Sequence, residues 1–345
     1  MAIDDTLARK RGLKVFGAGM HHDPLISTRK VALTNWGHSW VVLGVVVKFP
    51  FCPTRYFCLP ILFRLYVSKQ TVAKQGGTYR TRPELAVEML NVLSHAHPAR
   101  RFHAVADSAY GGQSVLAHLP SNCDLTSRLD LDARLYDAVP ARKSGIHGRP
   151  RRRGTRLPTP RQMLKQRGRR LTLNMYGRRD RCRVADGIGR VYAVPDRPLR
   201  IVAVEPLSGG RGVQAFYSTR HDAGTEAVLR WYAMRWSIEE ANQNSKGQLG
   251  FEEPQGWTRQ AVERTAPTAM LLYGLILLWF AREGHQHYRA PHRPWYLGKT
   301  QASFADMLAT LRCESARQRV LSLGLSGKGS RKIADTLTEV VRQAA

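Results

Sequence analysis

The chain has few cysteines, and none of them is placed for a metal site or a disulfide framework. Its 345 residues contain five cysteines, an odd number scattered along the chain, without a Cys-x-x-Cys pair. This pattern argues against a zinc ribbon and against a small secreted domain held together by disulfides. A reducing cytoplasm is the compartment that suits it best.

Long apolar runs are also missing. The longest apolar stretch, residues 266–280, is interrupted by Pro267, Thr268 and Gly274, and it is shorter than the roughly 20 residues that a membrane-spanning helix needs. We therefore expect a buried helix over residues 259–280 and no membrane span. The first residues carry two carboxylates and no apolar run, so we expect no signal peptide.

Acidic residues are scarce relative to basic ones. The chain has 26 Asp and Glu against 54 Lys and Arg, a formal net charge of +28. Such an excess indicates a polyanionic partner, with nucleic acid as the leading candidate and an anionic membrane surface as the alternative. Because 43% of the residues are hydrophobic, the chain can still bury a sizeable core.

What the sequence does contain is an unusual helical segment, residues 232–246. At about 100° per residue, Arg235, Glu239 and Lys246 fall at roughly 300°, 340° and 320° from Tyr232. Glu240 falls near 80°, off this stripe. A solvated face of alternating charge would read the same way. Flanking apolar side chains, including Trp231 and Ile238, instead predict a partly buried helix whose charges need partners or a substrate.

The same four residues resemble a known family pattern. Tyr232, Arg235, Glu239 and Lys246 reproduce the spacing of the Y-R-E-K signature of DDE transposases of bacterial insertion sequences. The resemblance implies an α/β fold: an RNase H-like mixed sheet flanked by helices, with a mostly β insertion before the helix carrying the catalytic Glu. It also implies that Tyr232, Arg235 and Lys246 hold terminal DNA phosphates.

Two aspartates are needed beside such a glutamate, and the first is expected near the start of the chain. Asp4 and Asp5 stand at a strand end, where a turn or helix cap is the ordinary interpretation. Members of the family carry their first catalytic Asp just before a Thr, which here is Asp5. Asp4 stays the alternative, because neighbours on a strand point to opposite faces and no local rule separates them.

The second aspartate follows a short apolar strand. Asp107 opens the run Asp-x-x-Tyr-Gly after residues 101–106, at the kind of strand end where open α/β sheets collect ligands. An ordinary helix cap would look alike. The run is similar to the second catalytic Asp region of the same transposases.

Three carboxylates from two strands and a helix suit hard cations. Mg²⁺ prefers oxygen ligands, and two such ions can hold both oxygens of an in-line phosphoryl displacement. We therefore predict Asp5, Asp107 and Glu239 as catalytic metal ligands, with two Mg²⁺ ions as cofactors and Mn²⁺ as a substitute. The resemblance implies that the protein is a DNA transposase, which nicks element ends and transfers strands through the 3′-hydroxyl.

The resemblance also implies partners and a location. Double-stranded DNA, as terminal inverted repeats and as target, would be bound by a homodimer at paired ends, in the bacterial cytoplasm and on the nucleoid. Some members stack a flipped base on an aromatic side chain of the insertion; candidates here are Tyr176, Tyr192, Phe216 and Tyr217. Alternatives are a catalytically inactive DNA-binding remnant and a host RNase H-like nuclease.

A basic segment separates the two halves of the expected catalytic core. Residues 142–170 contain twelve Lys or Arg and no Asp or Glu, with Arg151, Arg152 and Arg153 at the densest point. We predict a solvated arm that binds phosphates. Around it, residues 171–176, 191–194, 199–206 and 214–218 predict strands.

The predicted organisation has four parts. Residues 1–135 begin the catalytic core, 136–222 form the basic β insertion, 223–282 complete the core and 283–345 form a helical tail. Residues 29–36 and 40–48 predict two strands joined by a turn at Gly37-His38. Because the first Asp lies so close to the start, we expect a clipped first strand and an N-terminal truncation relative to the family.

Overall fold

A single mixed sheet runs through the protein. The computed structural model describes residues 1–23, 25–28, 30–141, 151–175, 178–209, 212–290, 298–299 and 301–322, with isolated positions beyond 322. Its first six strands are β1 (Ala2–Arg9), β2 (Gly19–His22), β3 (Thr34–Phe49), β4 (Cys52–Tyr66), β5 (Phe102–Ala106) and β6 (Cys123–Leu129). β1 is parallel to β5 and β5 to β6, whereas β3 is antiparallel to β1, β2 and β4. The RNase H-like mixed sheet predicted from the sequence is confirmed.

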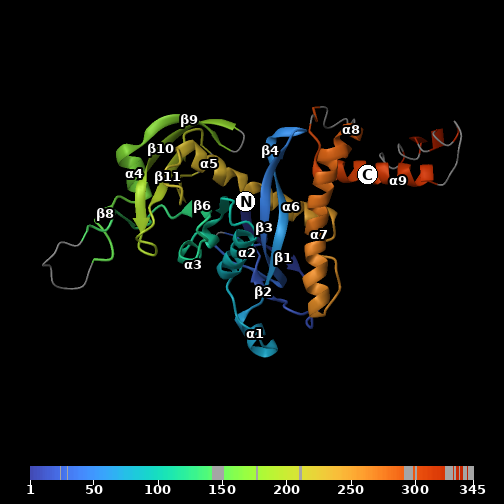
Figure 1. Ribbon diagram of the computed structural model, residues 1–345, viewed down its shortest axis with the longest axis horizontal. Helices are drawn as coiled ribbons and strands as arrows, with labels where there is room; N and C mark the ends of the chain where they lie inside the picture. Colours follow the sequence, from blue (N-terminus) through green and yellow to red (C-terminus); the bar gives the residue numbers. More distant parts are fainter. Residues whose placement is uncertain are drawn as a thin grey trace.

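The insertion continues this sheet and does not build a separate one. Its strands are β7 (Leu135–Tyr136), β8 (Arg156–Leu157), β9 (Arg169–Met175), β10 (Arg178–Val191), β11 (Leu199–Pro206) and β12 (Gln214–Ser218). β12 pairs with β6, and β11 and β10 follow outward, so that β2, β3, β1, β5, β6, β12, β11, β10, β7 and β8 lie in this order. In Figure 1 the insertion lies on one side of the core strands.

Helices cover both faces of the sheet. Their bounds are α1 (Lys69–Gln75), α2 (Arg82–Ala96), η1 (Ser108–Tyr110), α3 (Gln113–Leu116), α4 (Pro160–Arg167), α5 (Thr225–Met234), α6 (Trp236–Gln248), α7 (Arg259–Trp279), η2 (Phe280–Gly284), α8 (His285–His287) and α9 (Phe304–Ser322). One apolar core joins the sheet to α2, α3 and α4. A second joins it to α6, α7 and α9, and a third joins β9–β12 to α5. Figure 1 shows α7 and α9 at the end of the molecule away from the insertion.

The sequence expectations for β3 and for the place of Asp4 and Asp5 need correction. β1 is an eight-residue strand that pairs with β3 from Ala2 opposite Gly44 to Arg9 opposite Gly37, so the two aspartates lie inside the strand and not at its end. β3 is one strand of 16 residues that passes straight through Gly37-His38. A Cβ at Gly37 would lie 2.2 Å from the Ala8 carbonyl oxygen. The glycine therefore permits close approach of β1 and does not make a turn.

The basic segment is partly folded, contrary to the expectation of a solvated arm. Residues 142–150 lie outside the described part of the chain, but α4 and β8 both lie in the basic run. Thr159 and Gln162 form a reciprocal capping box at the start of α4, with Pro160 in the first turn. Met163 and Leu164 are buried against the sheet. The cap and the burial of these two side chains stabilise α4 within the basic run.

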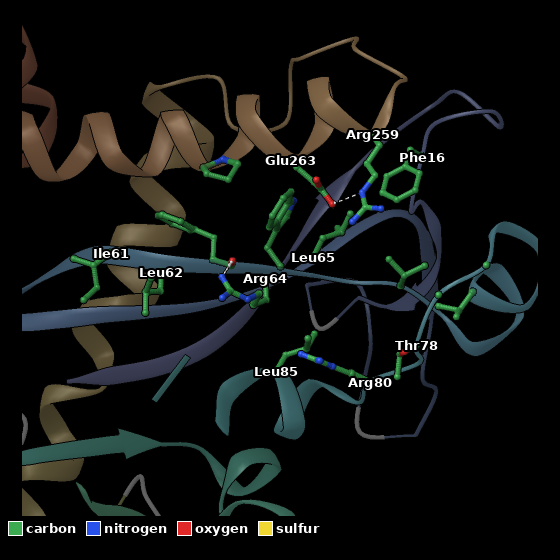
Figure 2. Close-up of a pocket in the computed structure, with 17 residues that line it drawn as sticks. Phe16, Ile61, Leu62, Arg64, Leu65, Thr78, Arg80, Leu85, Arg259 and Glu263 are labelled. Atoms are coloured by element: carbon green, nitrogen blue, oxygen red, sulfur yellow. Dashed lines mark hydrogen bonds and ion pairs between the residues drawn. The ribbon is translucent and has the colours of Figure 1, made fainter. Parts of the chain in front are cut away.

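The predicted buried helix at residues 259–280 corresponds to α7. By length and composition alone, Arg259–His287 is the one helix in the described residues that could cross a membrane. Met270, Tyr273, Ile276 and Leu277 are buried in the core against the sheet and α9. The helix packs as a core element of an α/β protein. Near its start, Arg259 and Glu263 line a pocket with Arg64 of β4 and Arg80 (Figure 2).

Candidate active site

Two adjacent carboxylates in the middle of β1 point to opposite faces of the sheet. Successive strand residues alternate: Ile3 packs in the core under α2, whereas Ala2 packs in the core under α6. Asp5 accordingly accepts a hydrogen bond from the Tyr110 hydroxyl at 2.9 Å and lies 3.4 Å from Arg82 of α2. Asp4 faces α6.

The environment of Asp4 is mostly buried and crowded with negative charge. Its side chain is 15% exposed, and its nearest cation is Arg235, at 3.7 Å. Burial first, and then the carboxylates of Asp5, Asp107 and Glu239, raise the pKa of Asp4 to about 7, while Arg235 opposes the rise. The carboxylates of Asp107, which follows β5, and of Glu239 on α6 therefore repel the carboxylate of Asp4 on β1.

Arg235 lies at the junction of two helices where one continuous helix was predicted. α5 ends at Met234 and α6 begins at Trp236. α5 packs under the insertion strands and α6 under β1 and β4. The guanidinium of Arg235 is 2.5 Å from Glu239 and contacts Asp4. Burial works against this charge, but Glu239, Tyr232 and Asp4 raise the pKa of Arg235, so it stays a cation.

Asp107 directly follows β5, in a loop that several hydrogen bonds fix. Its carboxylate accepts a hydrogen bond from the Ala109 amide at 2.9 Å and so caps η1. Its backbone carbonyl accepts a hydrogen bond from the Ser127 hydroxyl of β6 at 2.7 Å. The helix cap that is the ordinary interpretation of Asp107 is therefore present. The same carboxylate also contributes to the raised pKa of Asp4.

Comparison with known proteins identifies the family. The sequence profile of the DDE superfamily endonuclease family matches residues 1–190. The chain belongs to this family. No curated protein matches it. The matched segment of this DDE endonuclease contains β1 and Asp107, and it ends before α6 and Glu239.

Membership establishes the general activity. A DDE endonuclease acts on DNA, in keeping with the charge of +28, and such nucleases use divalent metals. Within the described residues, no three carboxylate, imidazole or thiolate side chains form a ready metal cage, and Arg235 bridges two of the carboxylates. The donors nevertheless fit a hard cation, because Asp4, Asp107 and Glu239 offer only oxygens. Burial, and then repulsion from the neighbouring carboxylates, raise the pKa of Asp4, and a bound cation would offset both.

Tyr232 of the DDE endonuclease is a buried neighbour of Arg235. It is 6% exposed and packs against Phe216 of β12 with ring centres 4.6 Å apart. The Arg235 guanidinium lies 5.5 Å from its ring centre, within the range of a cation–π contact. The tyrosine therefore supports the arginine from the insertion side.

Lys246 lies at the far end of α6 and is bound to β1. Its ammonium donates to the Leu7 carbonyl at 2.6 Å and lies 3.6 Å from Glu252. Burial lowers the pKa of Lys246, and Glu252 acts in the opposite direction. Glu240, which the helical phase separated from the stripe, is bound to Arg55 of β4 at 2.8 Å.

The described part of the basic arm begins at residue 151. Arg151, Arg152 and Arg153 are exposed. Arg153 donates to the Tyr136 hydroxyl at 3.0 Å and lies 5.9 Å from the ring centre of Tyr192. Among the aromatic candidates, Phe216 and Tyr217 are 1% exposed, Tyr192 is 58% exposed, and Tyr176 lies outside the described residues.

Sequence reasoning overlooked two residues beside the site. Tyr110 belongs to the Asp-x-x-Tyr-Gly run, yet nothing in its spacing indicated that it would reach Asp5. Arg82 begins α2 and contacts Asp5 on the face of the sheet that α2 covers. The start of α2 was predictable from Thr81, Pro83 and Glu84, but its contact with β1 depends on the packing of the helix on the sheet.

Proposed function

We propose that this DDE endonuclease is an insertion-sequence transposase of the Y-R-E-K branch. It would nick the ends of its element and join the freed 3′-hydroxyl to target DNA. Asp4, Asp107 and Glu239 would hold the metal ions, and Asp4 replaces the Asp5 favoured by the sequence motif.

The observation that carries this proposal is the grouping of charge around Asp4. Arg235 contacts both Asp4 and Glu239, and Asp107 contributes to the raised pKa of Asp4. Asp5 points to the other face, where Tyr110 and Arg82 contact it. Asp4, and not Asp5, therefore lies on the face of the sheet where it would hold a metal ion together with Glu239.

When bound, two Mg²⁺ ions, or Mn²⁺ in their place, supply a more acidic attacking water or hydroxyl and charge for the leaving 3′-oxygen. The protein contributes position and charge. Arg235 suits a forked contact with a phosphate and Lys246 a point contact. Arg235 contacts Glu239 and Lys246 contacts Glu252 in this structure, so each cation would leave its carboxylate to contact a DNA phosphate.

The insertion and its arm would hold the DNA. The exposed Arg151, Arg152 and Arg153 can neutralise phosphates, which makes binding fall steeply with salt. The substrates would be terminal inverted repeats and target DNA, bound by a homodimer with one catalytic site for each end. Such a protein would work in the bacterial cytoplasm on the nucleoid.

Glu239→Gln tests the proposed function directly. The amide keeps the shape of the side chain and removes the charge that attracts the metal, so Mg²⁺-dependent nicking of an inverted-repeat duplex should fall by at least about 1,000-fold. Binding of the same duplex, measured by fluorescence anisotropy, should stay within a few-fold of wild type.

The neighbouring residue provides a matched control. Glu240→Gln makes the same chemical change one position along α6 and breaks only the contact with Arg55. It should nick at nearly the wild-type rate. Equal nicking by Glu239→Gln and wild type would refute the proposal, and cutting without preference for repeat ends would favour a host nuclease instead.

Tyr192 is the aromatic that we propose for stacking on an unpaired base at the element end. It is the exposed candidate among those described, and Arg153 lies against its ring. Stacking is worth about 1–3 kcal/mol per base, so Tyr192→Ala should slow opening of a nicked end about 10-fold or more. Tyr192→Phe keeps the ring and should retain the rate; an equal loss in both variants would contradict a stacking role.

A further inference from the structure

A buried tyrosine hydroxyl links strand β1, which carries the first aspartates, to the loop that carries Asp107. Tyr110 is fully buried, and its hydroxyl donates to Asp5 Oδ1 at 2.9 Å. Burial and the charge of Asp5 raise the pKa of Tyr110 well above its usual value, so it remains a donor. Asp5 adjoins Asp4, and Tyr110 lies three residues after Asp107.

The other oxygen of Asp5 is held from α2 and β3. Arg82 Nε lies 3.4 Å from Asp5 Oδ2 and donates to the Ser39 hydroxyl at 2.8 Å. The Arg82 guanidinium lies 4.4 Å from the ring centre of Tyr66. The capping box of Thr81 and Glu84 fixes the start of α2, and with it the position of Arg82.

The loop that carries Tyr110 is anchored independently at both ends. Ser127 donates to the Asp107 carbonyl at 2.7 Å, and Tyr217 donates to the Gly111 carbonyl at 2.8 Å. A Cβ at Gly111 would lie 2.4 Å from the Ser127 hydroxyl oxygen, so glycine is required for this close approach. A movement of Tyr110 would therefore move the Asp107 loop as a unit.

Backbone pairing does not hold β1 and β5 together at the aspartates. The parallel register of the two strands covers only Ala2 opposite Val105 and Ile3 opposite Ala106. Asp4 and Asp107 are the next residues on each side, so they lie where this register stops. Beyond this point the Asp5–Tyr110 bond is a side-chain connection across the same gap.

We propose that Asp5 and Tyr110 are positioning residues that set the separation of Asp4 and Asp107. This inference rests on the proposed function, because those two carboxylates are the proposed metal ligands. The bond replaces the missing backbone pairs and keeps the two carboxylates close enough to share a cation. Partners that orient ligands typically contribute about 10–100-fold to metal affinity.

The test is the affinity of the full chain for Mn²⁺, measured by electron paramagnetic resonance of the free ion. Tyr110→Phe removes one hydroxyl and keeps the ring, and it should weaken Mn²⁺ binding about 10–100-fold. Tyr273→Phe is the matched control, because Tyr273 is 2% exposed on α7, in a different core. It should bind Mn²⁺ as the wild type does.

A second variant separates positioning from folding. Asp5→Asn retains an oxygen that accepts from Tyr110, so it should bind Mn²⁺ within a few-fold of wild type, whereas Asp5→Leu should resemble Tyr110→Phe. Equal Mn²⁺ affinity in wild type and in a folded Tyr110→Phe, or an equal loss in Tyr273→Phe, would overturn the inference. If Tyr110→Phe does not fold, Asp5→Leu decides in the same way.

The outcomes also separate this inference from the proposed function. A wild-type chain that binds Mn²⁺ but neither nicks nor joins DNA would remove the transposase proposal and leave the positioning role intact. A wild-type chain that cuts repeat ends, with Tyr110→Phe unchanged in both cutting and Mn²⁺ affinity, would overturn the positioning role alone. No Mn²⁺ binding by the wild type would overturn both.

Discussion

Asp4→Asn is expected to abolish Mg²⁺-dependent cleavage, with a loss of about 1,000-fold or more. Asparagine keeps the size of the side chain but lacks the charge that holds a divalent cation, and such a cation supplies several kcal/mol of transition-state stabilisation. The measurement is single-turnover nicking of an inverted-repeat duplex at saturating protein, so that weaker DNA binding does not enter the rate.

Asp5→Asn is the matched control for this prediction. It makes the same change one residue along β1, on the face that α2 covers, and retains the hydrogen bond from Tyr110. We expect it to keep cleavage within about 10-fold of wild type, since it acts on the metal only through its neighbours. If Asp5→Asn does not cleave DNA and Asp4→Asn does, Asp5, the residue that the motif favoured, is the first metal ligand.

Arg235→Ala is expected to destabilise the metal-free protein by about 3 kcal/mol near pH 7, because it leaves two partly buried carboxylates without their cation. The side chain is 14% exposed and contacts both Asp4 and Glu239. Added Mn²⁺ should restore part of this loss, since a bound cation supplies the missing charge.

The pH dependence identifies the cause. The folded-state pKa of Asp4, about 7, lies above its ordinary value of 3.8. Between these values the folded chain keeps a proton that the unfolded chain releases, so stability falls as the pH rises through this window. Without Arg235 the pKa of Asp4 rises further, so the fall in stability continues to higher pH. Urea unfolding at pH 5 and pH 7.5 should therefore show a larger difference for the variant than for wild type.

An exposed arginine pair is the control for this measurement. Arg259 is 70% exposed and pairs with Glu263 one turn along α7. Arg259→Ala should change stability by less than about 1 kcal/mol at either pH, as is usual for surface pairs. A loss in Arg235→Ala that is the same at both pH values would point to lost packing and contradict the electrostatic explanation.

Sequence patterns were sufficient for features that depend on local spacing. Helical phase separated Glu239 from Glu240. In the structure Glu239 forms an ion pair with Arg235, and Glu240 forms one with Arg55. The capping box of Thr81 and Glu84 at the start of α2 is a local signal of the same kind. The strands at 199–206 and 214–218 match β11 and β12, because both are apolar runs between turn residues. The metal-binding roles assigned to these residues stay predictions.

The features that were wrong or undecided depend on contacts between distant segments. The choice between Asp4 and Asp5 requires knowledge of which sheet face α6 covers. β10 was missed because its first half alternates arginine with short side chains, and its neighbours β9 and β11 stabilise it. Arg183, for example, pairs with Glu205 of β11. In the sequence Gly37 resembles a turn residue, but its role is to let β1 lie close to β3, which only the folded structure shows.

The continuous sheet also limits how this chain could have been assembled. β12 is hydrogen-bonded to β6, and α5, which leads into the helix carrying Glu239, is buried against β9–β12. Excision of residues 136–222 would leave the β6 edge unpaired and strip the apolar face of α5. The insertion is therefore not a modular graft that can be exchanged between relatives. Its strands and the helix carrying Glu239 have to vary together, so a chimaera that swaps one without the other would lose its fold before its specificity changed.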